Sequence, residues 1–185
     1  MASSPFPWIF RYEDEGRTQG TEFLRKPLLR PVVVVRALGA HLGSQNIQAL
    51  VDSGADHVLA APWIAQDIGV TPDASRELTV QIGGAHRKVR FADVAIQLLP
   101  PEFSVSEGGY DPGSVFEWYT QVGFFLEWNN PPWSMVLGQI GFFDRFTITF
   151  NRESQALAVT HLEDFDARYP QPPADHPNRR PLRQI

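Results

Sequence analysis

The segment Asp52-Ser53-Gly54-Ala55 combines residue types suited to acid–base chemistry. The apolar run Ala49-Leu50-Val51 precedes it, so we expect the Asp52 carboxylate at the end of a buried strand. A carboxylate positioned in a cleft can take a proton from a bound molecule or give one to it. Ser53 adds a hydroxyl beside the carboxylate, Gly54 permits a sharp turn and Ala55 leaves room for close approach. The segment therefore makes Asp52 a candidate catalytic residue.

A second segment, Val136-Leu137-Gly138, strengthens this interpretation. Asp-Ser-Gly alone is also ordinary turn chemistry, because all three residues favour turns. Two aliphatic residues before the aspartate, a small residue after it and a second apolar segment ending in glycine are a more specific combination. The pattern favours a catalytic loop over a plain turn.

With these segments the sequence resembles the retropepsin-like, or retroviral-type, aspartic proteases, which have one lobe per chain. The resemblance spans roughly residues 28 to 159. Its three segments follow one another in the expected order, as catalytic loop, flap hairpin and crossing segment. They are Ala49-Leu50-Val51-Asp52-Ser53-Gly54-Ala55-Asp56, Gln81-Ile82-Gly83-Gly84 and Val136-Leu137-Gly138-Gln139-Ile140-Gly141-Phe142-Phe143.

The resemblance implies a role for each matching residue. Asp52 would be catalytic, and Leu137 and Gly138 would support the active-site loop. The residues implied to bind substrate are Ser53, Gly54, Ala55, Asp56, Ile82, Gly83 and Gly84. Neither a metal nor a cofactor is implied. The chain differs from the family pattern where Ser53 replaces a common Thr, His57 a common acidic residue, and Gln139 an Arg found in some relatives.

The implied fold is mainly β, a single-lobe acid-protease (retropepsin-like) β-barrel with one or two short helices. The apolar patterns predict strands at 28–38, 45–51 and 58–59, a hairpin of 76–82 with 88–99, an aromatic strand or strand pair at 115–128 and a closing hairpin of 147–150 with 156–159. Short helices are predicted from Ala61-Pro62 to about Gly69 and at 140–146.

The chain divides into three parts. Residues 1–26 are predicted to be an arm whose Trp8, Phe10 and Tyr12 could pack on the domain or on a partner. Residues 27–167 form the protease-like domain, and 168–185 a Pro-rich disordered tail. Within the domain, residues 100–133 are absent from minimal family members. This insertion would be either a specificity wall beside the cleft or an edge cover or dimer contact.

The chain contains a single Asp-Ser-Gly sequence, so the second catalytic aspartate must come from another copy. Peptide hydrolysis without a covalent intermediate needs a base to activate water and an acid to protonate the leaving nitrogen. Two adjacent carboxylates that share one proton provide both. We therefore expect a homodimer with one Asp52 from each chain.

Composition excludes several other classes. The 185 residues contain no cysteine, which rules out thiol catalysis and disulfides. The formal net charge of −5 argues against nucleic-acid binding. No secretory signal and no apolar run of membrane-spanning length are visible, which predicts a cytoplasmic protein without a membrane partner. The histidines are dispersed without metal-ligand spacing, and Gly-x-Ser-x-Gly is absent.

Two functions remain from the sequence. The first is an aspartic endopeptidase acting on a peptide or protein substrate through the two Asp52 carboxylates of a homodimer. The second is a non-proteolytic peptide-binding or assembly module that retains the same fold, since a fold alone does not imply activity.

Overall fold

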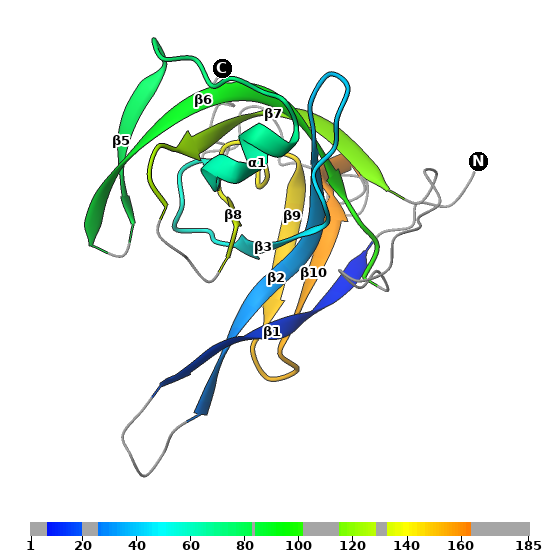
Figure 1. Ribbon diagram of the computed structural model, residues 1–185. Helices are drawn as coiled ribbons and strands as arrows, with labels where there is room; N and C mark the ends of the chain where they lie inside the picture. Colours follow the sequence, from blue (N-terminus) through cyan, green and yellow to red (C-terminus); the bar gives the residue numbers. More distant parts are fainter. Residues whose placement is uncertain (1–6, 20–25, 83, 102–114, 129–132, 164–185) are drawn as a thin grey trace, which may run out of the picture.

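A computed structural model describes residues 7–19, 26–82, 84–101, 115–128 and 133–163, which contain ten strands and one short helix. Figure 1 labels them: β1 (Trp8–Gln19), β2 (Lys26–Leu38), β3 (Ile47–Val51), β4 (Val58–Ala60), α1 (Pro62–Asp67), β5 (Glu77–Ile82), β6 (Ala85–Leu98), β7 (Phe116–Phe125), β8 (Met135–Leu137), β9 (Phe146–Asn151) and β10 (Ala156–His161). The predicted mainly β class is confirmed. The helix in this part of the chain is too short to cross a membrane.

Six of the strands form a closed barrel. Around the ring, β6 pairs with β7, then follow β4, β8, β3 and β2, and β2 pairs again with β6. The pairs β3–β8 and β4–β7 are parallel, and the other pairs of the ring are antiparallel. Closure leaves the ring without a free edge, as the predicted single-lobe barrel requires.

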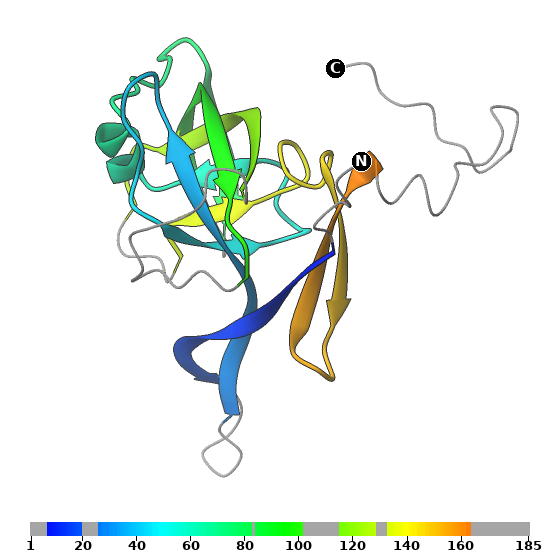
Figure 2. The same cartoon turned by 90° about the vertical axis from the view of Figure 1, so that its right-hand side faces the viewer.

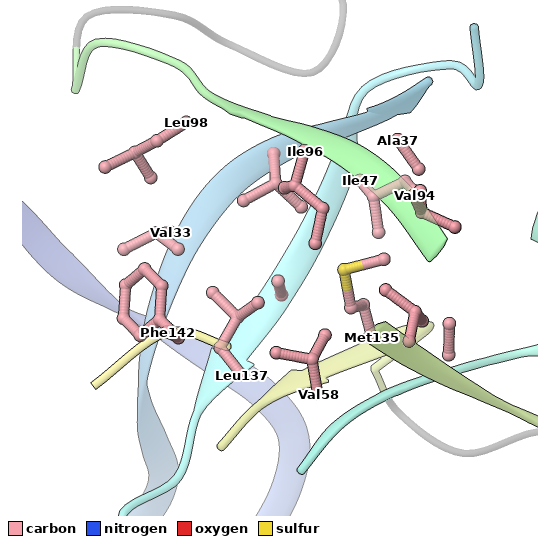
Figure 3. Packing of buried hydrophobic residues seen from close by; sticks show 14 of the residues in the cluster. Val33, Ala37, Ile47, Val58, Val94, Ile96, Leu98, Met135, Leu137 and Phe142 are labelled. Carbon is pink, nitrogen blue, oxygen red and sulfur yellow. The ribbon is translucent and has the colours of Figure 1, made fainter. Parts of the chain in front are cut away.

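Aliphatic side chains fill the barrel. The β-branched run of β2, Val32 to Val35, has the composition typical of a strand with buried faces. Figure 3 shows Val33 of β2, Ile96 of β6 and Leu137 of β8 converging in this interior. The core thus holds together the strands on either side of the Asp52 loop.

Within the predicted arm of residues 1–26, residues 8–19 form strand β1. Its first half pairs with β10, from Trp8 opposite Val159, and its second half pairs with β2. Trp8 and Phe10 alternate with exposed residues and are buried, so the expected packing of these aromatic residues on the domain is confirmed. The alternation of apolar and polar residues is short and ends at the charged residues 13–15. For this reason the sequence pattern did not indicate a strand. Strands β1, β10 and β9 extend the sheet away from the barrel (Figures 1 and 2).

Strand β7 lies within the segment predicted to be an insertion, yet it is part of the barrel. It pairs with β6 along its whole length, from Phe116 opposite Leu98 to Phe125 opposite Val89. Trp118, Val122 and Phe124 are buried in the core. Residues 116–125 are therefore a single strand of the barrel, paired on both sides. Residues 102–114 of the predicted insertion lie outside the described part of the chain.

The helix predicted at 140–146 is wrong, because this segment forms consecutive turns. Gly141 has a φ of 103°, a backbone conformation incompatible with a right-handed helix. Its carbonyl accepts a hydrogen bond from the buried Trp118 indole at 2.7 Å. Phe142 and Phe146 pack around the same indole, so aromatic packing determines the path of this segment. The predicted closing hairpin is confirmed as β9 and β10, whereas the predicted tail at 168–185 lies outside the described residues.

Candidate active site

Asp52 directly follows β3, in a turn that fixes its carboxylate. The backbone N–H of Gly54 donates to Asp52 Oδ1 at 2.9 Å, and the N–H of Ala55 donates to the Asp52 carbonyl at 3.2 Å. The N–H of Asp52 itself donates to the carbonyl of Leu137 at 3.1 Å. The half-buried side chain is therefore held by its own turn at one oxygen, while its loop is tied to β8.

The segment after β8 crosses behind this turn, as predicted. The N–H groups of Gln139 and Ile140 donate to the carbonyls of Ala55 and Asp56, both at 2.8 Å. The Gln139 side chain donates from Nε2 to the carbonyl of Ser53 at 2.7 Å. Although Gln139 stands where some relatives have Arg, its amide still tethers the loop. Two segments more than eighty residues apart thus form one hydrogen-bonded unit.

Gly138 lies at the closest approach between the two segments. A Cβ atom at this position would lie 2.4 Å from the carbonyl oxygen of His57 and 2.6 Å from that of Ala55. Both neighbours are backbone atoms, which cannot move aside as a flexible side chain could. The crossing therefore requires glycine, while the active-site role expected for this residue stays a prediction.

We expect Gly138→Ala to lower the free energy of unfolding by about 3 kcal/mol or more, since it places a methyl group against two backbone oxygens. Urea titration followed by far-ultraviolet circular dichroism measures this. Gly84→Ala is the matched control, because Gly84 has a φ of 81° but open space around its Cβ position. Backbone strain alone should cost about 1 kcal/mol there. Equal losses in the two variants would show that the contact at Gly138 can relax.

A pocket of about 470 Å³ opens beside the Asp52 turn. Asp52 and Ser53 line it together with Ile82, which is the last residue of β5 in the predicted flap hairpin. The structure therefore brings the catalytic segment and the flap segment to one cavity. The complete lining is Arg30, Pro31, Leu50, Val51, Asp52, Ser53, Ile82, Trp128, Trp133, Val136 and Phe150.

The flap hairpin is formed by β5 and β6, in register from Glu77 opposite Arg90 to Ile82 opposite Ala85. At its base, Glu77 accepts hydrogen bonds from Lys88 Nζ at 2.7 Å and from Arg90 Nε at 3.0 Å. These bonds lower the pKa of Glu77 below its ordinary value, and the bond from Lys88 has the larger effect. Ion pairs thus connect the two strands at the base of the hairpin, while its turn contains Gly84.

The remaining predicted site residues have mixed placements. Leu137 and Gly138 are buried behind the loop, as expected for support. Gly54, Ala55, Asp56 and Gly84 do not line the pocket, so their contact with substrate stays a prediction. Gly83 lies outside the described residues.

Sequence reasoning missed most of the pocket wall. Arg30 and Pro31 come from β2 and Phe150 from β9, and no local pattern links these strands to the Asp52 loop. Trp128 and Trp133 belong to the predicted insertion 100–133, for which a wall beside the cleft was one of the expected roles, and both line the pocket. No group of three His, Asp or Glu side chains that could hold a metal ion occurs in the described part of the chain.

No protein-family model and no curated protein matches this chain. Solved structures are similar to it, among them the following two. A retropepsin-like aspartic protease from Rickettsia conorii is 15% identical, with a TM-score of 0.40, over 69% of this chain and 81% of that one. The retroviral protease-like domain of Ddi1 from Leishmania major is 13% identical, with a TM-score of 0.39, over 71% of this chain and 94% of that one. Both likenesses are distant.

Proposed function

We propose that this protein is an aspartic endopeptidase that uses water activated between the Asp52 carboxylates of two copies of the chain. One observation carries the proposal. The Asp52 carboxylate lines a pocket that the flap hairpin also reaches, on a loop fixed from behind by the glycine crossing. A positioned carboxylate, a concave site and a hairpin beside it are the parts that one copy of the chain would contribute to this hydrolysis.

The chemistry follows from two carboxylates that share one proton. The ionised member removes a proton from water as the water oxygen adds to the peptide carbonyl carbon. The protonated member gives its proton to the peptide nitrogen, which leaves as the amine when the C–N bond breaks. The proton taken from water stays on the first member, so the pair again shares one proton. Both members are Asp52, so neither has a fixed role until an asymmetric peptide binds.

Strand β9 supports the two-copy arrangement. The sheet formed by the described residues ends at β9, whose outer edge faces no other strand of that sheet. The sequence Thr147-Ile148-Thr149-Phe150-Asn151 carries no charge that would deter pairing with another strand. Phe150, which is 41% exposed, also lines the pocket of Asp52. A second copy paired along this edge would therefore lie next to the pocket that lacks a second carboxylate.

A digest of a peptide library by the wild-type protein and by Asp52→Asn tests the proposal. Cleavage by the wild type alone supports the peptidase. Identical digests would remove the enzymatic claim and leave the alternative, a module that holds a peptide in the same pocket without cleaving it.

We expect chelators to leave the activity unchanged, because the proposed chemistry uses carboxylates and water alone. Turnover of a library-derived peptide is measured before and after dialysis against EDTA. Activity that is lost on dialysis and restored by one divalent ion would contradict the mechanism and indicate a metallohydrolase.

A further inference from the structure

Two tryptophans in the pocket wall have indole N–H groups for which the described residues provide no hydrogen-bond acceptor. The Nε1 atoms of Trp128 and Trp133 are buried, and in the described part of the chain no other buried side-chain nitrogen or oxygen lacks a partner. Both residues line the pocket that contains Asp52. Trp133 is 6% exposed, so water has little access to its ring.

The cost of such groups makes their location informative. An unpaired buried donor destabilises a protein, and buried indole N–H groups usually find an acceptor. The barrel interior follows this rule, because the Trp118 indole donates to the carbonyl of Gly141 at 2.7 Å. The exceptions therefore coincide with the candidate active site, where a bound molecule can provide the acceptor.

The surroundings of the two donors are otherwise apolar. Trp128 packs edge-on against Phe125, with ring centroids 3.9 Å apart, and Leu50 and Val136 line the same pocket. An apolar stem fits such a wall, and an oxygen at its end would pair with the indoles. A charged end is disfavoured beside the indoles, because the apolar wall desolvates it. The rest of the pocket lining carries one basic residue, Arg30, and one acidic residue, Asp52, whose charges have opposite sign.

We propose that Trp128 and Trp133 form a specificity wall that selects a substrate residue whose apolar stem ends in an uncharged carbonyl, Asn or Gln. The proposal rests on the proposed function in one respect, that the bound molecule is a peptide. Both nitrogens are covered by protein atoms. Binding therefore includes a shift of the indoles, and a peptide that reaches them changes the tryptophan fluorescence.

Binding to Asp52→Asn protein tests the wall without turnover. The probes are short Ala/Ser host peptides that carry one Leu, Asn, Gln or Glu at each position in turn, and affinity is read from tryptophan fluorescence and calorimetry. Leu and Asn have nearly the same shape, so their affinity ratio isolates the carbonyl. We expect the peptide with Asn or Gln to bind about tenfold more tightly than the peptide with Leu at one position. A hydrogen bond to a buried donor that otherwise lacks an acceptor strengthens binding by about this factor.

The decisive variants replace Trp133 or Trp128 by benzothienylalanine, which keeps the two fused rings and exchanges the N–H for sulfur. In these proteins the ratio should fall to about one. The same replacement at Trp118 is the matched control, because it removes a buried N–H that already has its acceptor. It should lower the melting temperature and leave the ratio unchanged. Trp133→Phe provides a second test with a natural residue if one replaced protein does not fold.

Several results would contradict the proposed specificity wall. These are equal affinity for Leu and Asn in the protein with both indoles, tighter binding of Glu, and a ratio that survives the loss of both N–H groups. If loss of the N–H groups weakened the binding of every peptide equally, the indoles would donate to a main-chain carbonyl of the peptide and not to a side chain. These outcomes are separate from failure of the peptidase, because wild-type protein that cleaves nothing can still bind with the expected ratio, and an active peptidase can lack it.

Discussion

Asp52→Asn is expected to lower kcat by about a thousandfold or more while the protein stays folded. General acid–base groups contribute about 10² to 10⁴ in rate, and the amide can neither take nor give the proton. The fold survives because the Asn oxygen can still accept the hydrogen bond that Gly54 N–H now makes to Asp52 Oδ1 at 2.9 Å. Replacing this charge-assisted bond by a neutral one should cost about 1 kcal/mol.

Steady-state kinetics on a library-derived peptide and urea unfolding measure the two effects together. Asp67→Asn is the matched control, since Asp67 is an exposed carboxylate at the end of α1, outside the pocket. It should retain full activity and nearly full stability. Turnover by Asp52→Asn within tenfold of the wild type would remove the catalytic role of Asp52. Loss of folding in that variant would show that its carboxylate is needed for structure.

The Asp52 loop and its crossing segment could be predicted because each has a local signature. An aliphatic strand must end where a polar turn begins, and Gly138 is needed because two backbone carbonyls occupy the space of a side chain. The flap was predictable for a similar reason, as two apolar strands meet at a glycine turn. These features depend on residues close together in the chain.

The parts that the sequence did not predict depend on pairing between distant residues. Arg30 and Phe150 reach the pocket only because β2 and β9 are placed by β3, β1 and β10. Strand β7 seemed additional because nothing local shows that β6 continues its pairing into an aromatic strand. Residues 141–145 form turns where a helix was predicted. The indole of Trp118, more than twenty residues away, donates a hydrogen bond to the carbonyl of Gly141 and so fixes the path of this segment. Periodicity cannot encode such contacts.

The specific activity is expected to fall on dilution, in parallel with the dimer fraction measured by sedimentation. One chain contributes one Asp52, so a dyad can form only between two copies. The β9 edge offers the surface, because it is one of the two open ends of the described sheet and carries Phe150 next to the pocket. Dilution below the dissociation constant of the dimer should then abolish turnover without unfolding the monomer.

Thr149→Lys tests the surface itself. Thr149 is exposed on β9. If two copies pair along β9 around a two-fold axis, a lysine at this position would lie close to the paired strand or to the same lysine of the other copy. We expect dimerisation to weaken about tenfold or more, and activity to fall with it. Thr79→Lys is the matched control, since Thr79 is exposed on β5 at the other end of the sheet, and it should leave the sedimentation profile unchanged.

A mixture of Thr149→Lys and Thr149→Glu should restore both the dimer and the activity, because opposite charges then face each other across the same edge. This rescue separates loss of the interface from damage to the fold, which mixing cannot repair. Persistence of the dimer in Thr149→Lys would place the interface elsewhere on the molecule. A monomer with full activity at every concentration would refute the shared site. A stable dimer that cleaves no peptide would instead favour the binding module, since the two carboxylates would then be present without the chemistry they are proposed to perform.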